Sequence, residues 1–321
     1  MAGRLLVTGA SGFLGRSLLP ALTRRGFAIV APVRSQQPPQ DGVVFPLVES
    51  IETVDWRPLL AGVDAVVHLA GIAHTKNAVA EEIYDRINAE AALRLAKACE
   101  GRVSRLVFVS SIRAISGPTA DAVLDDDSPA GPTDAYGRSK LKAERGLAIL
   151  DLPTTILRPV TVYGVGVKGN LAKLARWAGS PAPLPFGALR AARSFLSIDN
   201  FASAILFSLA RTASESESFV LADPEPSSVA DLLAGLRAGL GRPARLLIVS
   251  PRLFGAAAAM TGQAENWAVL SGALPVRPRK LLEAGWSPPI ARSRDGARLW
   301  GEAMRASRGD RRAPRPPDPP V

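Results

Sequence analysis

The sequence predicts an α/β fold: a doubly wound parallel sheet forms the body, and a smaller C-terminal lobe is attached to it. Short β-branched, apolar runs alternate with helical stretches through the first half of the 321 residues. The runs are almost continuously apolar, as expected for strands that are covered on both faces. From Val160 onward this pattern stops, and glycine, proline and alanine dominate up to Arg193.

The elements can be predicted in chain order. Strands are expected at residues 5–8, 27–33, 43–47, 64–70, 105–111 and 154–158, and helices at 17–26, 81–100, 136–150 and 201–210. A last strand at 219–222 is expected to return to the main sheet. Gly26 favours the end of the first helix, and Asp134 or Thr133 can cap the helix at 136–150. Pro46 weakens the third strand because proline cannot donate to a strand ladder.

The change of pattern after the first half predicts three segments. Residues 1–160 form the sheet-containing body, and right-handed crossovers make its sheet doubly wound. Residues 161–302 form the smaller, substrate-binding lobe and supply elements that return to the sheet. Residues 303–321 form a disordered, basic and proline-rich tail. A hydrophobic share of 47% provides enough side chains for a large core.

The composition excludes several kinds of site. The single cysteine, Cys99, excludes an intramolecular disulfide and fits a cytoplasmic location. Because only His68 and His74 accompany it, Cys/His zinc sites are excluded, and no metal site is expected. No apolar run reaches the roughly 18–20 residues of a membrane span. The net charge is +10, but outside the tail the arginines are scattered, so no nucleic-acid partner is expected.

Three glycines, Gly9, Gly12 and Gly15, occupy the stretch TGASGFLG between an expected strand and an expected helix. In a dinucleotide-binding turn, the first glycine permits the sharp bend, the second lets the backbone approach the pyrophosphate, and the third lets the helix pack on the sheet. The amide groups at the helix N-terminus attract the phosphates. The alternative is an ordinary loop with structural glycines. The context favours cofactor binding by a Rossmann-type body.

The residues after the second strand indicate which cofactor is bound. An acidic residue about 20 positions past the glycines normally holds the ribose hydroxyls of NAD. Between Gly15 and Gln40 the chain has no Asp or Glu, and the second strand ends in Val33-Arg34-Ser35. Because an arginine can pair with a 2′-phosphate, NADP(H) is favoured. The alternative is that Arg34 is a solvated surface residue and that NAD(H) binds without the usual carboxylate.

A tyrosine and a lysine, Tyr136 and Lys140, are spaced to share one face of a helix. A tyrosine hydroxyl has a reference pKa of about 10, and a nearby ammonium group would lower it. Tyr136 could then exchange a proton with a carbonyl/hydroxyl pair. Ser111, at a strand end, could hydrogen-bond the same substrate oxygen. The alternatives are a surface helix pair and a strand-end serine bonded to local backbone.

Five motifs occur together and in one order: VVHLAG at 66–71, YDRINAEAALRLAKAC at 84–99, FVSS at 108–111, YGRSK at 136–140 and LRPVTVYG at 157–164. Over residues 4–290 the chain resembles the extended short-chain dehydrogenase/reductases of the NAD(P)-dependent epimerase/dehydratase family. Its loop motifs are most similar to those of bacterial UDP-sugar 4-epimerases and 4-ketoreductases of surface-polysaccharide pathways.

The resemblance implies a set of site residues. It makes Ser111, Tyr136 and Lys140 the catalytic residues. It makes Ser111, Asn170 and Arg193 the residues that bind a nucleotide-sugar substrate, with the Arg193 guanidinium at the pyrophosphate. The implied cofactor-binding residues are Gly9, Ser11, Gly12, Phe13, Leu14, Gly15, Arg34, Leu69, Ala70, Gly71, Asn88, Tyr136, Lys140 and Pro159.

The chain also departs from the family pattern. It lacks the acidic residue at the end of the second strand, and it has Pro46-Leu47 where the family has another acidic residue near the adenine. It has Ile115-Ser116-Gly117 where the family often has a VYG motif. The first two departures leave the cofactor open, and the third leaves the sugar open.

The resemblance implies an NAD(P)-dependent enzyme that acts at C4 of a nucleotide-activated hexose, as a 4-ketoreductase or a 4-epimerase. Arg34 favours the reductase, because NADPH is the usual reductive donor. Two other functions are retained as alternatives: a non-catalytic, cofactor-binding member of the family, and a reductase of a non-sugar carbonyl substrate. The resemblance also implies a homodimer joined through the helix that carries Tyr136 and Lys140.

Overall fold

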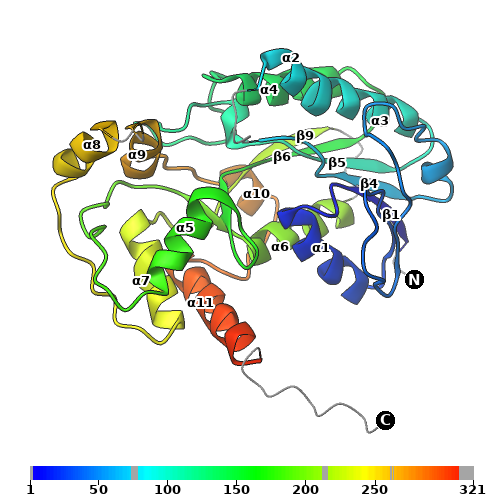
Figure 1. Ribbon diagram of the computed structural model, residues 1–321. Coiled ribbons are helices and arrows are strands. Elements are labelled where there is room, and N and C mark those ends of the chain that lie inside the picture. Colours follow the sequence, from blue (N-terminus) through cyan, green and yellow to red (C-terminus); the bar gives the residue numbers. More distant parts are fainter. Residues whose placement is uncertain (1–2, 74–78, 212–215, 261, 263, 311–321) are drawn as a thin grey trace, which may run out of the picture.

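The computed structural model describes residues 3–73, 79–211, 216–260, 262 and 264–310 (Figure 1). Their main sheet is parallel throughout, with the strand order β3-β2-β1-β4-β5-β6-β9. Its strands are β1 (Arg4–Thr8), β2 (Ala28–Val30), β3 (Val43–Val44), β4 (Ala65–His68), β5 (Arg105–Val109), β6 (Thr154–Pro159) and β9 (Glu217–Leu221). This confirms the predicted α/β, doubly wound, Rossmann-type sheet, including a late strand that returns beside β6.

Helices cover both faces of the sheet (Figure 1). On one face, α1 (Phe13–Arg24) and α6 (Ile198–Ala210) pack on side chains such as Val7 and Val109. On the other, α3 (Ala91–Cys99) and α4 (Ala135–Leu147) pack on Leu6 and Phe108. The alternation of Leu6 and Val7 follows from the period of two in a strand. Burial on both faces explains why the strands are apolar at nearly every position.

Two predicted elements differ in detail. The strand expected at 43–47 is only β3, and the pairing that continues past Pro46 is a single bridge between Val33 and Leu47. The helix expected at 81–100 is divided into α2 (Glu81–Tyr84), a π-helical turn η2 (Asp85–Glu90) and α3. Apolar periodicity in the sequence does not reveal such a turn.

The smaller lobe has its own core, formed by side chains of α5 (Gly169–Ala178), α7 (Val229–Gly239) and α11 (Ser293–Asp310). The two-stranded sheet of β7 (Thr161–Tyr163) and β8 (Phe195–Ser197) adjoins it. The remaining helices of the described lobe are α8 (Pro251–Met260), α9 (Ala264–Ser271) and α10 (Arg279–Glu283). Because α11 continues to Asp310, residues 303–310 of the expected tail are helical, whereas 311–321 lie outside the described residues.

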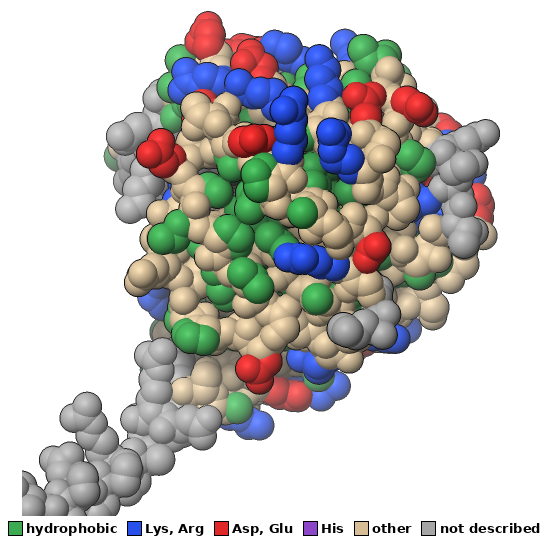
Figure 2. All heavy atoms as spheres, turned by 90° about the vertical axis from the view of Figure 1, so that its right-hand side faces the viewer, with side chains coloured by type: hydrophobic (Ala, Val, Ile, Leu, Met, Phe, Trp, Pro, Cys, Tyr) green, Lys and Arg blue, Asp and Glu red, His purple; other side chains and the backbone are tan. Residues whose placement is uncertain are grey.

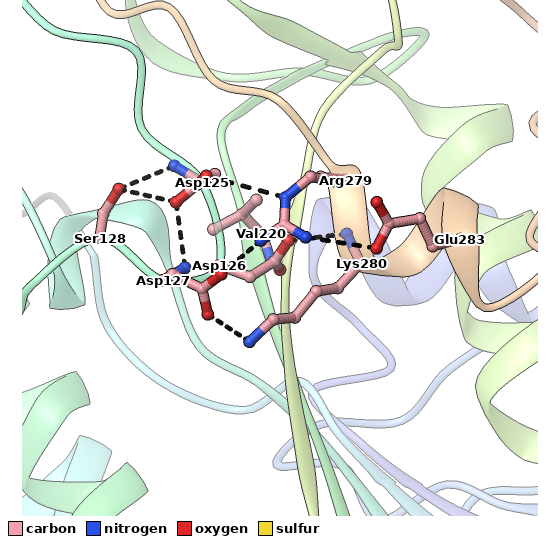
Figure 3. Close-up of polar contacts among 8 residues, drawn as sticks. All are labelled: Asp125, Asp126, Asp127, Ser128, Val220, Arg279, Lys280 and Glu283. Carbon is pink, nitrogen blue, oxygen red and sulfur yellow. Dashed lines mark hydrogen bonds and ion pairs between the residues drawn. The ribbon is translucent and has the colours of Figure 1, made fainter.

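An acidic segment anchors the loop that follows β5 (Figure 3). The buried Asp126 carboxylate accepts hydrogen bonds from the amides of Val220, in β9, and Lys280, in α10, at 2.7 and 2.9 Å. Asp127 forms ion pairs with Lys280 and Arg279. A buried carboxylate with two backbone donors is well satisfied. The loop after β5 is therefore tied to the returning strand and to α10.

The surface carries charges of both signs. On the face shown in Figure 2, lysine and arginine side chains are interspersed with acidic and hydrophobic ones. In the part of the chain that the structure describes, no helix is long and apolar enough to cross a membrane, and no three His, Cys, Asp or Glu residues are grouped as a metal site would require.

Candidate functional site

The glycine turn between β1 and α1 has the backbone geometry of a phosphate-binding turn. Gly9 has φ of 72°, and a Cβ atom there would lie 2.7 Å from the Ala70 nitrogen. A Cβ at Gly15 would lie 2.5 Å from the Ala10 Cα. The Gly9 and Gly15 positions therefore exclude any side chain, because these neighbours are backbone atoms. Gly12 is the N-cap of α1, and having no side chain it adds no atoms at the helix end.

The N-terminus of α1 is open to an anion. No side chain caps it, and its first turn contains no acidic residue. The first amides of a helix have no acceptor within the helix, and the helix dipole adds positive potential there. Ser11 is exposed at this end, and Phe13 and Leu14 are half-buried. These features fit the pyrophosphate of a nicotinamide dinucleotide, which would be held by the backbone from Gly9 to Gly15.

The loop after β4 is held rigidly beside this turn. The Thr8 hydroxyl lies 2.8 Å from His68 Nδ1 and accepts a hydrogen bond from the Ala70 amide at 3.3 Å. Asn88, on the π-helical turn, exchanges two hydrogen bonds with the backbone of Ile72, at 2.8 and 2.9 Å. Residues 69–72 of this loop thus lie between β1 and the turn that carries Asn88. π-helical turns such as η2 are frequent at functional sites.

Gly71 lies where a side chain would collide with the residues around Lys140. A Cβ there would be 2.8 Å from Asn88 Oδ1 and 3.5 Å from Lys140 Nζ. The structure therefore brings together Gly71, Asn88 and Lys140, three of the residues that the sequence analysis predicts to bind the cofactor. His74 lies outside the described residues.

His68 is a neutral group under this site. Burial lowers its pKa to about 3, and the nearby Lys140 adds to the effect. Its ring stacks on Phe108 with centroids 5.7 Å apart. An imidazole that is neutral at all physiological pH values contributes packing and hydrogen bonding but no positive charge.

Ser111 and Tyr136 meet at the carboxyl end of β5. Their side chains are hydrogen-bonded to each other. Burial raises the pKa of Tyr136, and the bond to Ser111 and the positive charge of Arg113 oppose this effect. Ser111 also begins the 3₁₀ turn η3 (Ile112–Ala114) and accepts a hydrogen bond from the Arg113 amide at 3.2 Å. Asp134 caps α4 by accepting from the Gly137 amide at 2.6 Å, which confirms one of the two expected caps.

Lys140 lies one turn of α4 after Tyr136 and is buried. Its ammonium group donates to the Val109 carbonyl at 2.9 Å and lies 4.8 Å from the centroid of the Phe108 ring. Burial lowers the pKa of Lys140 to about 8, and the negative charge of Glu144 opposes this shift. The lysine is thus fixed against β5, on the same side of α4 as Glu144.

A second layer of polar residues supports the lysine. Glu144 accepts from the Ser110 hydroxyl at 2.5 Å and forms a bidentate pair with Arg158, whose shortest contact is 2.7 Å. Both partners are largely buried, so removing either would leave a buried charge unpaired. The prediction from the sequence missed Glu144 and Arg158, although Glu144 continues the i, i+4 spacing of Tyr136 and Lys140.

The other predicted residues lie on different elements. Arg34 is exposed after β2, and among the described residues it forms no ion pair with a carboxylate. Pro159 ends β6, next to Leu221 of β9. Asn170 is exposed near the start of α5, on a cavity of about 200 Å³ that Trp177 also lines.

Arg193 is buried between the body and the lobe. Its guanidinium donates to the carbonyls of Gly272 and Pro118, at 2.9 and 3.1 Å. Burial lowers the pKa of Arg193 to about 10, and the positive charge of Arg113 contributes to this shift. Arg193 therefore bridges the end of α9 and the loop after β5, and a second arginine lies close enough to repel it.

Two proteins of known activity are similar to this chain in sequence over most of their length. A UDP-glucose 4-epimerase from Vibrio cholerae is 31% identical over 301 residues, which span 90% of this chain and 92% of that protein. A 3-diazoavenalumate denitrifying reductase from Streptomyces sp. is 30% identical over 91% of this chain and 98% of its own length.

Solved structures show the same fold. MoeE5 in complex with UDP-glucose and NAD has a TM-score of 0.74 at 24% identity, over 95% of this chain and 99% of that one. Human epimerase family protein SDR39U1 with NADPH has a TM-score of 0.72 at 21% identity, over 93% and 99%. The sequence model of the NAD dependent epimerase/dehydratase family matches residues 5–222. This protein therefore belongs to the NAD-dependent epimerase/dehydratase family.

Proposed function

We propose that the protein is an NAD(P)-dependent enzyme acting at C4 of a nucleotide-activated hexose, as a 4-ketoreductase or a 4-epimerase. The hydrogen-bonded pair of Ser111 and Tyr136, one helical turn from the buried Lys140, carries this proposal. A cofactor-binding protein without catalysis would need the glycine turn but not this pair. The intact pair therefore argues against the non-catalytic alternative.

In the proposed reaction, Tyr136 moves the proton and Ser111 orients the substrate oxygen. The bound nicotinamide supplies the site that accepts or donates hydride. The Tyr136 phenolate would take a proton from the C4 hydroxyl when the sugar is oxidised, and the resulting phenol would return it to the C4 oxygen when the ketone is reduced. Ser111, fixed by its bonds to Tyr136 and to the Arg113 amide, can share the charge that develops on the C4 oxygen.

A nucleotide diphosphate fits the charges on the lobe side of the site. Arg193 is a buried guanidinium that never loses its charge at neutral pH, because its pKa stays at about 10. We assign Arg193 to the diphosphate of the substrate and Asn170 to the same ligand. On binding, the Arg193 guanidinium would exchange a hydrogen bond to a backbone carbonyl for hydrogen bonds to phosphate oxygens. The relatives named UDP-glucose 4-epimerase and the MoeE5 complex with UDP-glucose support this substrate class.

Whether the enzyme is an epimerase or a 4-ketoreductase can be tested first with UDP-GlcNAc and no added cofactor. If the purified protein interconverts UDP-GlcNAc and its C4 epimer, it is an epimerase, and the reductase is excluded. If it consumes NADPH only when a UDP-4-keto-6-deoxy sugar is supplied, it is a 4-ketoreductase, and the epimerase is excluded. If it accepts neither but reduces a non-sugar ketone, the sugar proposal fails. The Streptomyces relative named as a denitrifying reductase makes this third arm necessary.

We also propose that NADP(H) is the preferred cofactor, because Arg34 is exposed, unpaired with a carboxylate among the described residues, and follows β2. Replacing Arg34→Gln is expected to weaken NADPH binding about tenfold, through the loss of a charge-assisted contact to the 2′-phosphate. NADH, which lacks this phosphate, should bind the variant and the wild type alike. Isothermal titration of both cofactors measures the effect. Equal losses for NADPH and NADH would show that Arg34 does not contact the 2′-phosphate.

The expected homodimer, joined through α4, and the cytoplasmic location remain predictions. Sedimentation of the purified protein measures the first of them.

A further inference from the structure

A second cation, the half-buried Arg113, lies beside Tyr136, and the proposed reaction assigns it no role. It follows Ser111 by two residues, on the η3 turn. Its side chain is 18% exposed, and its guanidinium forms an ion pair with Asp134. Its Nε is buried and has no hydrogen-bond partner among the described residues. A buried polar nitrogen without a partner is costly, which indicates that the position has a use beyond packing.

Arg113 links the two segments that hold Ser111 and Tyr136. Its amide donates to the Ser111 hydroxyl, and its guanidinium holds Asp134, the cap of the helix on which Tyr136 lies. The backbones of the two segments are also in close contact, because a Cβ at Gly137 would lie 2.2 Å from the Arg113 carbonyl oxygen. The position of Tyr136 relative to Ser111 is therefore set by residues 111–113 and 134–137 together.

The charges around the Tyr136 hydroxyl come from three elements. Arg113 faces it from η3 and Tyr84 from α2, where the two tyrosine rings are 6.3 Å apart. Lys140, on α4 itself, directs its ammonium to the Val109 carbonyl of β5. Arg193 lies beyond Arg113, close enough for the two guanidinium groups to repel each other. Arg113 is therefore the cation that favours the Tyr136 phenolate in this arrangement.

We propose that Arg113 is a positioning residue: it fixes the Ser111 turn to the first turn of α4 and supplies a positive charge next to the reacting hydroxyl. The expected effect of Arg113 on activity rests on the proposed function. The effect of Arg113 on the Tyr136 hydroxyl does not, because it can be measured without any substrate. Asp134 neutralises part of the charge, so the effect on Tyr136 is smaller than that of a free arginine.

The test is an NMR titration of the tyrosine Cζ carbons in the full-length protein. The chain has three tyrosines, Tyr84, Tyr136 and Tyr163, so three signals can be assigned with Tyr→Phe variants. Arg113→Gln is expected to raise the pKa of Tyr136 by about one unit, because the charge that favours the phenolate is removed. Arg113→Lys keeps the charge and should give a smaller rise. The control Arg138→Gln removes an exposed arginine on the same helix and should leave Tyr136 unchanged.

Activity provides the second readout. With a substrate that the wild type oxidises, the rising limb of the pH profile of kcat/KM should move to higher pH in Arg113→Gln by the same interval as in the titration. At pH 7 this corresponds to a loss of about tenfold, since one pKa unit is a factor of ten in phenolate. Arg113→Lys tests the idea if Arg113→Gln does not fold.

The inference is overturned if the Tyr136 signal titrates alike in wild type, Arg113→Gln and Arg113→Lys. A shift of the Tyr136 pKa in a protein that turns over no nucleotide sugar would leave the inference standing and refute the proposed function instead. A uniform loss of activity at all pH values, without a shift of the profile, would reduce Arg113 to a structural role and overturn the inference as well.

Discussion

Replacing Tyr136→Phe is expected to lower turnover by about 10²–10⁴-fold while cofactor affinity stays within a factor of a few. The substitution removes only the hydroxyl that bonds to Ser111, and the ring keeps its contact with Tyr84. The glycine turn and the N-terminus of α1, to which we assign the pyrophosphate, lie on another element. Steady-state turnover and a cofactor titration on the same preparation measure both quantities.

Tyr84→Phe is the matched control. It removes a hydroxyl that donates to the Ala73 carbonyl at 3.2 Å, close to the site but outside the proposed proton path. We expect this variant to change turnover by a few-fold at most. If Tyr136→Phe kept full activity, or if both variants lost activity equally, Tyr136 would not be the acid/base group.

Replacing Gly9→Ala is expected to abolish cofactor binding and to destabilise the protein by more than about 2 kcal/mol. An alanine at a positive φ costs about 1 kcal/mol by itself. At Gly9 the new Cβ would also lie 2.7 Å from the Ala70 nitrogen, so the turn and the loop after β4 would have to separate. Both segments line the proposed dinucleotide site, and their separation would remove its geometry.

Gly101→Ala separates the two effects. Gly101 has φ of 67°, close to that of Gly9, but a Cβ added at Gly101 would meet nothing within 4 Å. It should therefore show the conformational cost alone and bind cofactor normally. Denaturant unfolding and cofactor titration of both variants make the comparison. Normal cofactor binding by Gly9→Ala would contradict the assignment of the turn.

The sequence predicts the body of the fold well because its signals are local. Apolar runs such as LLVT and RLVFV identify buried strands, and Gly9 and Gly15 are required by contacts that only a glycine permits. The spacing of Tyr136 and Lys140 likewise fixes one face of α4. These features can be recognised from a few neighbouring residues.

The remaining features depend on contacts between distant segments. The π-helical turn around Asn88 becomes understandable only when Asn88 is seen bonded to the backbone of Ile72. Arg193 meets the carbonyls of Pro118 and Gly272, which are far from it in the chain. Arg113 resembles any loop arginine until its ion pair with Asp134 is known. Sequence patterns carry no distances between such segments, so these roles could not be predicted.

The central claim is that hydride is transferred at C4 of a nucleotide-linked hexose. Its most direct test is a single turnover of a UDP-4-keto-hexose by protein loaded with NADPH or with NADH, each deuterated at the transferable position of the nicotinamide ring. We predict deuterium at C4 of the UDP-hexose product, for a reductase and an epimerase alike, and its loss in Tyr136→Phe. Transfer of deuterium only to a non-sugar ketone, or no transfer from NADPH or NADH, would contradict the claim.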